Sequence, residues 1–90
     1  MHYVYVLISQ KDGKFYTGLT DNLKRRLKEH SAGEEPSTRH RRPFKLIYYE
    51  VCLNKQDAIA REKQLKTGRG KKYIKERLRH YLERDVAQLG

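Results

Sequence analysis

Two short stretches near the start of the chain are rich in residues that favour β-strands, and a polar segment separates them. Residues 3–9 and 15–20 consist mainly of tyrosine, valine, leucine, isoleucine and threonine, which pack well on a pleated, half-buried surface. The separating segment contains Asp12-Gly13, a pair typical of two-residue hairpin turns. The sequence therefore predicts a β-hairpin with Asp12 and Gly13 in its turn.

The length of this turn determines which residues of the hairpin face one another. With a two-residue turn, Tyr5 lies opposite Thr20. Side chains alternate between the two faces of a strand. One face of the hairpin is therefore expected to carry Tyr3, Tyr5, Tyr16 and Gly18, which combines phenol groups with a residue that has no side chain.

Three helices and one more strand are expected in the rest of the chain. The first helix spans about residues 22–32, with Asp21 or Thr20 as its N-cap. The second spans residues 54–66, and the third begins near residue 71 and presents one apolar face. With a strand over residues 45–52 between the first two helices, the order is hairpin, helix, strand, helix, helix. This order predicts an α+β fold.

Three functional groups lie on or beside the apolar faces of the first two helices. Arg26 and His30, four residues apart, flank the narrow apolar stripe of the first helix. Glu62 shares a face of the second helix with Ala58 and Leu65. A carboxylate on such a face must be paired, protonated or metal-bound to offset its desolvation. A salt bridge between Glu62 and Arg26 is the structural alternative to a functional role.

Composition favours a single domain with a polyanionic partner. The length of 90 residues is that of one domain, which we expect over residues 1–85, with a frayed tail over 86–90. The 21 Lys and Arg residues outnumber the 11 acidic ones, for a net charge of +10, and such an excess favours nucleic acid as the partner. The sequence contains no apolar run of membrane-spanning length, secretory signal or lipidation motif. We therefore expect a cytoplasmic protein that does not bind membranes.

Four kinds of side chain in this chain suit phosphodiester hydrolysis when they act together. A phenol can accept a proton, a guanidinium can bind phosphate, an imidazole can orient either group, and a carboxylate can bind a metal ion. Any one of the seven tyrosines is better explained by core packing. The order and spacing of the whole set therefore carry the functional interpretation.

The set resembles the GIY-YIG nuclease family, in particular its small stand-alone bacterial branch. Tyr3-Val4-Tyr5 matches the first family motif and Tyr16-Thr17-Gly18 the second, while residues 22–30 and 58–66 are similar to the two helices that follow. Two positions depart from the pattern, because Tyr3 replaces a glycine and a late asparagine has no counterpart. The resemblance implies a three-stranded antiparallel sheet flanked by helices.

The resemblance also implies a metal-dependent endonuclease that cuts nucleic acid, DNA rather than RNA, one strand per site. Arg26 would neutralise the phosphate, Glu62 would bind one Mg²⁺ or Mn²⁺ ion, and Tyr16 and His30 would orient the other groups. Tyr5 would help to deprotonate the attacking water. A free phenol has a pKa of about 10, so nearby cations or the metal would have to lower it.

Nucleic acid is expected to contact one glycine and eight cationic residues, and Gly18 is expected to leave room for the substrate backbone. These nine residues are Gly18, Arg25, Arg39, Arg41, Arg42, Lys66, Arg69, Lys71 and Lys72. Specificity is expected to come from the shape of the nucleic acid or from a protein partner, because no separate recognition domain is apparent in the sequence. Two other functions fit the charge: a catalytically weak nucleic-acid-binding module on the same scaffold, and an adaptor that docks acidic partners through the last helix.

Overall fold

The computed structural model describes residues 1–86 of the chain, and its centre is one antiparallel sheet. The sheet consists of β1 (His2–Ser9), β2 (Phe15–Thr20) and β3 (Phe44–Cys52). The strand order is β2-β1-β3, so β1 is central and hydrogen-bonds to both neighbours. The described residues include only the first position of the tail that we expected to fray.

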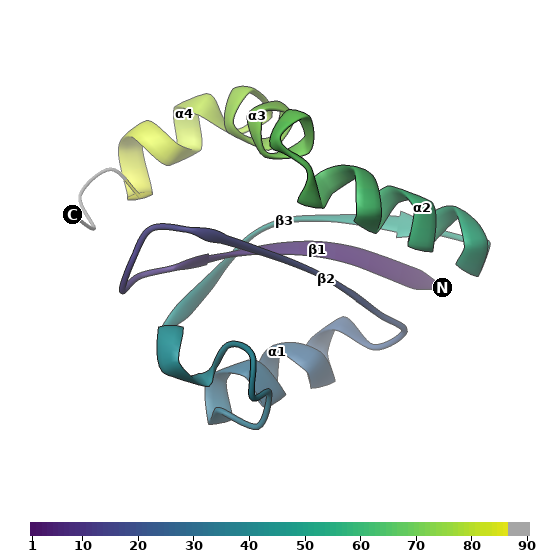
Figure 1. The fold of residues 1–90 in the computed structure, drawn as a ribbon, viewed down its shortest axis with the longest axis horizontal. Helices are drawn as coiled ribbons and strands as arrows, with labels where there is room; N and C mark the ends of the chain where they lie inside the picture. Colours follow the sequence, from purple (N-terminus) through teal and green to yellow (C-terminus); the bar gives the residue numbers. More distant parts are fainter. Residues whose placement is uncertain (87–90) are drawn as a thin grey trace.

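Helices cover both faces of this sheet (Figure 1). Helix α1 (Leu23–Ala32) lies against one face, and α2 (Lys55–Lys66) and α3 (Gly68–Arg77) lie against the other. Three short helices complete the described residues: η1 (Arg39–Arg41), α4 (Arg79–Tyr81) and η2 (Leu82–Val86). Within residues 1–86, no helix is long and apolar enough to cross a membrane. The predicted α+β fold, with a three-stranded antiparallel sheet flanked by helices, is confirmed.

The hairpin register differs from the prediction by two residues. Tyr5 pairs with Gly18 rather than Thr20, and the backbone N–H of Ser9 donates to the carbonyl of Lys14 at 2.9 Å. The hydroxyl of Ser9 also accepts hydrogen bonds from the backbone of residues 11 and 12, which stabilises a wider turn. A shift of two residues keeps every side chain on its face. The predicted face of tyrosines with Gly18 therefore survives.

The two faces of the sheet have different chemical character. Val4 and Val6 point toward α2 and α3 and form the main hydrophobic core with Ala58, Leu65 and Ile74. On the opposite face, Tyr5 and Leu7 are fully buried, and α1 contributes the buried His30. One side of the sheet is thus an apolar core, and the other contains buried polar groups.

Two helix starts differ from the sequence-based expectation. Asn22, rather than Asp21 or Thr20, caps α1, because its side chain accepts from the N–H of Arg25. Helix α3 begins at Gly68 rather than near residue 71, since the hydroxyl of Thr67 accepts from the N–H of Gly70 and caps the first turn. An N-cap of this kind partly offsets the low helix propensity of the glycines that follow it.

Gly18 is required because the side chain of Tyr5 lies directly over it. A Cβ atom at position 18 would lie 2.3 Å from the Tyr5 hydroxyl oxygen. The Tyr5 ring is fully buried and cannot swing away into solvent. The expectation that Gly18 leaves room for a substrate backbone is wrong in this structure, because Tyr5 fills the space above it.

We predict that Gly18→Ala destabilises the protein by about 1–3 kcal/mol, the usual cost of inserting a methyl group into a packed interior. Gly68→Ala is the matched control, because a Cβ atom there meets no other atom within 4 Å. Thermal unfolding of both variants tests this, with a lower Tm expected only for Gly18→Ala. An unchanged Tm for Gly18→Ala would contradict the close approach of Tyr5.

Candidate active site

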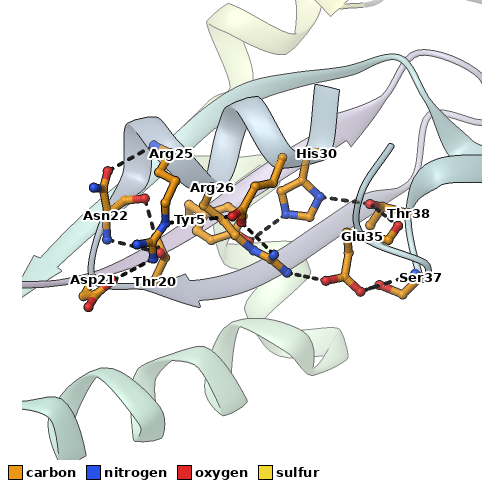
Figure 2. Close-up of polar contacts among 11 residues, drawn as sticks. Tyr5, Thr20, Asp21, Asn22, Arg25, Arg26, His30, Glu35, Ser37 and Thr38 are labelled. Carbon is orange, nitrogen blue, oxygen red and sulfur yellow. Dashed lines mark hydrogen bonds and ion pairs between the residues drawn. The ribbon is translucent and has the colours of Figure 1, made fainter. Parts of the chain in front are cut away.

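Helix α1 places Arg26 and His30 over the sheet so that both reach the hydroxyl of Tyr5 on β1. The two residues are one helical turn apart and therefore lie on the same side of α1. The Tyr5 hydroxyl oxygen lies 2.8 Å from Nε2 of His30, and Nε of Arg26 donates to the same oxygen at 3.3 Å. Figure 2 shows this convergence of three side chains on one buried oxygen. The geometry links a phenol, an imidazole and a guanidinium directly.

Tyr16 on β2 completes the aromatic part of the site. Its ring lies edge-on to the His30 ring with centroids 5.2 Å apart, and the Tyr5 and Tyr16 ring centroids are 6.5 Å apart. Phe44, at the start of β3, borders both Tyr16 and His30. The rings hold the imidazole in place. The four residues predicted from the two tyrosine motifs and the first helix therefore lie together.

Two carboxylates occupy the guanidinium of Arg26. Its Nη1 atom donates to Glu29 at 3.1 Å and its Nη2 atom to Glu35 at 2.5 Å. Glu35 belongs to the segment between α1 and β3, and its side chain is only 23% exposed. The hydrogen bond with Arg26 is the main reason that the pKa of Glu35 is lowered to about 2. The sequence analysis overlooked Glu35, because nothing in a loop acid next to Pro36 indicates that it folds back onto α1.

The same segment contacts the far side of His30. The hydroxyl of Thr38 lies 2.9 Å from Nδ1 of His30, and the Thr38 side chain is fully buried. Thr38 was also missed by the sequence analysis. The sequence of a polar loop does not indicate that one of its threonines is buried. The role of Thr38 becomes clear only when the loop is known to pack against α1.

Burial sets the protonation of the central pair. Desolvation raises the pKa of Tyr5 to about 12, and the hydrogen bond from Arg26 offsets only part of this effect. Burial and the charge of Arg26 lower the pKa of His30. At neutral pH Tyr5 is therefore a protonated phenol beside a neutral imidazole. The cation Arg26 does lower the Tyr5 pKa, as expected, but the effect of burial is larger.

Glu62 lies on α2, which packs against the opposite face of the sheet from α1 (Figure 1). Its carboxylate pairs with Lys66 at 3.4 Å and its side chain is 20% exposed. In the described part of the chain, no hydrogen bond or ion pair joins Glu62 to Tyr5, Tyr16, Arg26 or His30. The proposed salt bridge between Glu62 and Arg26 is wrong, because Glu29 and Glu35 occupy that guanidinium.

Part of the expected nucleic-acid surface comes together at the hairpin end of the sheet. An open hollow of about 500 Å³ is lined by Arg41 and Lys71, two of the predicted nucleic-acid contacts, together with Lys14, Lys75 and Phe15. Lys14 and Lys75 were not predicted to contact nucleic acid; they come from the hairpin turn and the last turn of α3. Phosphate groups are the natural ligands of such a cationic hollow.

The remaining basic residues fall into two groups. Arg69 and Lys72 are exposed on the first turns of α3, and Arg39 is exposed in η1. Others are engaged within the protein: Arg25 with Asp21, Lys66 with Glu62, and Arg42 with the carbonyls of Ser31 and Arg39. Arg41 of the hollow is likewise paired, with Asp12. The engaged side chains have structural contacts that a phosphate would have to replace.

We predict that the ion pair of Glu35 makes stability depend on acid pH. The folded-state pKa lies below the ordinary value of 4.5, so the stabilisation is present above pH 4.5 and is lost as the pH falls toward 2. The difference in unfolding free energy between wild type and Glu35→Gln should therefore shrink across this range, as measured by urea unfolding. Glu34→Gln, an exposed neighbour, is the control. A difference that stays constant from pH 6 to pH 3 would contradict the assignment.

Comparisons with known proteins identify the family of this chain. Residues 1–79 match the family described as the GIY-YIG catalytic domain. A UPF0213 protein of Staphylococcus haemolyticus is 42% identical over 67 residues, which cover 73% of this chain and 80% of the relative. A UPF0213 protein of Clostridium perfringens is 46% identical over 67 residues, covering 73% and 71%. The NMR structure of a UPF0213 protein from Bacillus halodurans shares 38% identity with a TM-score of 0.52, and the match covers 81% of this chain and 80% of that one. The chain therefore belongs to the GIY-YIG catalytic domain family, together with these UPF0213 relatives.

Proposed function

We propose that this protein is an endonuclease that hydrolyses phosphodiester bonds in nucleic acid, with DNA as the expected substrate and one strand cut per site. The observation that carries the proposal is the buried contact of Tyr5 with both His30 and Arg26. A structural core needs no such arrangement, because a phenylalanine would fill the same space without three polar groups to satisfy. Membership of the GIY-YIG catalytic domain family supports the same reaction class.

In this proposal Tyr5 passes on a proton rather than ionising first. A phenol with a pKa of about 12 is rarely ionised at neutral pH, but its oxygen lies 2.8 Å from Nε2 of the neutral His30. As the attacking water gives a proton to the Tyr5 oxygen, the phenol proton can move to His30 and leave an imidazolium. The water becomes the hydroxide that attacks phosphorus. Tyr16 keeps the imidazole in position through its ring contact.

Arg26 would neutralise the charge that develops on the phosphate oxygens. Its guanidinium already binds Glu29 and Glu35, so a phosphate must replace at least one carboxylate. Glu35 is the better candidate to leave, since it comes from a connecting segment and not from α1 itself. Substrate binding would thus open the site and admit water to Tyr5, whose side chain is otherwise buried.

Glu62 would hold the metal ion. Mg²⁺ often binds through one or two carboxylates, with substrate phosphates and water as the other ligands, and a partly exposed glutamate whose partner is a single lysine suits that role. Residues 1–86 contain no group of three acidic, histidine or cysteine side chains that could hold a metal by themselves. One Mg²⁺ or Mn²⁺ ion, when bound, would stabilise charge on the leaving oxygen. Helix α2 packs against β2, the edge strand that also carries Tyr16.

The cationic hollow at the hairpin end would bind phosphates away from the cleaved bond. The hollow is lined by Lys14, Arg41, Lys71 and Lys75. The net charge of +10 would attract the protein to nucleic acid over a long range. We expect this to happen in the cytoplasm. These contacts would be insensitive to sequence. A protein partner would then supply specificity.

A second candidate is a nucleic-acid-binding module without useful turnover. The observation that favours it is the closed state of the site, in which Arg26 is neutralised and Tyr5 is buried. The two functions separate in one experiment, in which labelled DNA and RNA of several structures are incubated with Mg²⁺, Mn²⁺ or EDTA. The nuclease cuts only with metal present. The binding module shifts the same nucleic acids in a gel, more weakly at high salt, without cutting them.

For the nuclease, we predict that Arg26→Ala and Glu62→Ala each reduce cleavage by about 10²-fold or more, the effect of removing one preorganised charge-stabilising group. Tyr5→Phe should reduce cleavage similarly while leaving nucleic-acid binding unchanged, because it removes a single hydroxyl group. Rates measured in single-turnover reactions, beside Tm for each variant, separate chemistry from folding.

Lys28→Ala serves as the control for charge removal from α1, since Lys28 is exposed and belongs to no part of the proposed site. It should cut at nearly the wild-type rate. Full activity of Glu62→Ala would end the metal-site assignment. If Arg26→Ala lowers the Tm while Tyr5→Phe cuts at the normal rate, the buried cluster of Tyr5, Arg26 and His30 stabilises the fold and takes no part in cleavage.

A further inference from the structure

We propose that Thr38 is a positioning residue that accepts the Nδ1 hydrogen of His30 and, together with Arg26 and Tyr5, fixes the tautomer in which Nε2 is free to accept the Tyr5 proton. The catalytic consequence rests on the proposed nuclease function, whereas the tautomer itself does not. Thr38 lies outside both tyrosine motifs and both helices that carry the other site residues. Its hydroxyl lies 2.9 Å from Nδ1 of His30.

The direction of the hydrogen bonds follows from Arg26. A guanidinium can only donate, so the Tyr5 oxygen accepts the hydrogen bond from Nε of Arg26. If Nε2 of His30 carried a hydrogen as well, the Tyr5 oxygen would face two donors and its own hydrogen would have no partner. In a side chain that is fully buried, that arrangement would leave a hydroxyl donor unsatisfied, which is unfavourable. Tyr5 therefore donates to Nε2.

The position of the single N–H hydrogen of His30 follows from this. A neutral imidazole carries one N–H, and with Nε2 as the acceptor this N–H is on Nδ1. Thr38 is the group that faces Nδ1, so its hydroxyl oxygen accepts. The Thr38 hydrogen can then point to the carbonyl of Glu35, 3.5 Å away. Every group in this series of hydrogen bonds, which runs from Arg26 through Tyr5, His30 and Thr38 to the Glu35 carbonyl, has a partner. No buried side-chain nitrogen or oxygen among the described residues lacks one.

The doubly protonated imidazolium is disfavoured before reaction. His30 is 1% exposed, and burial together with the charge of Arg26 lowers its pKa. The charged groups that face it are Arg26 and, beyond it, Glu29 and Glu35, whose carboxylates act in the opposite direction. When the Tyr5 proton arrives at Nε2, Thr38 continues to accept from Nδ1 and supports the imidazolium.

One segment thus secures both functional residues of α1. The carboxylate of Glu35 holds the Arg26 guanidinium, and three residues later the Thr38 hydroxyl holds the His30 ring (Figure 2). The backbone N–H of Thr38 also donates to the carbonyl of Glu35 at 3.2 Å, which makes the segment a compact turn. A change in Thr38 should therefore be felt at His30 rather than in the fold as a whole.

The test measures the tautomer directly, without any cleavage reaction. Long-range ¹H–¹⁵N correlation spectra of the imidazole rings distinguish a protonated from an unprotonated nitrogen, and His30→Gln identifies the His30 signals by their loss. We expect wild-type His30 at neutral pH to carry its hydrogen on Nδ1. Thr38→Val, which has nearly the same shape without the hydroxyl, removes the acceptor of the Nδ1 hydrogen and should therefore give a detectable share of the Nε2–H tautomer, even though Tyr5 still faces Nε2. Thr38→Ser should retain the wild-type spectrum.

Ser37→Ala is the matched control, because Ser37 carries a hydroxyl one residue away that bonds to Glu35 and not to His30. It should leave the tautomer unchanged. Wild-type His30 with its hydrogen on Nε2, or an unchanged tautomer in folded Thr38→Val, would overturn the proposal. If Thr38→Val does not fold, the wild-type and Thr38→Ser spectra still decide it, since either one with hydrogen on Nε2 contradicts the assignment.

Cleavage assays then test the catalytic consequence separately. With a cleaving wild type, Thr38→Val should lower kcat by about tenfold or more with little change in KM, as expected for loss of an oriented proton acceptor, and Thr38→Ser should restore it. An unchanged kcat in Thr38→Val despite a changed tautomer would overturn the positioning role. A wild type that binds without cutting would contradict the proposed nuclease and leave the tautomer result standing on its own.

Discussion

The position of one buried hydroxyl group determines the arrangement of the whole site. The Tyr5 oxygen must find partners because water cannot reach it, and it finds them in Arg26 and His30. Those partners fix how α1 lies over the sheet. The ring beneath the hydroxyl leaves no space for a side chain at position 18, so the strand opposite must carry glycine there. Helix, strand and connecting segment are therefore coupled through a single atom.

The same coupling explains why the structure shows a closed site. Arg26 is a permanent cation beside a buried phenol, and it would be costly to leave without a counterion. Glu29 and Glu35 supply that counterion and occupy the positions that phosphate oxygens would take in our proposal. A phosphate brings negative charge of its own, so exchange of Glu35 for substrate keeps the charge of the cluster balanced.

Local patterns were enough to predict the elements and four of the site residues, whereas long-range contacts were not. Alternation on β1 and β2 placed Tyr5, Tyr16 and Gly18 on one face even though the turn was assigned two residues too short, because a shift of two leaves the faces unchanged. The roles of Glu35 and Thr38 depend on how the segment after α1 folds back, and no periodic pattern encodes that. The salt bridge suggested between Glu62 and Arg26 was also wrong, since sequence spacing does not reveal that α1 and α2 lie on opposite sides of the sheet.

Titration of Tyr5 tests the central role of this hydroxyl most directly. The protein can be labelled with tyrosine carrying ¹³C at Cζ, and Tyr5→Phe identifies the Tyr5 signal among the seven tyrosines. A hydroxyl buried between Arg26 and His30 should ionise with a pKa of about 12 in the folded protein, after the exposed tyrosines. A Tyr5 pKa near the ordinary value of 10, measured while the protein is still folded, would mean that the hydroxyl is in contact with water and would contradict the account.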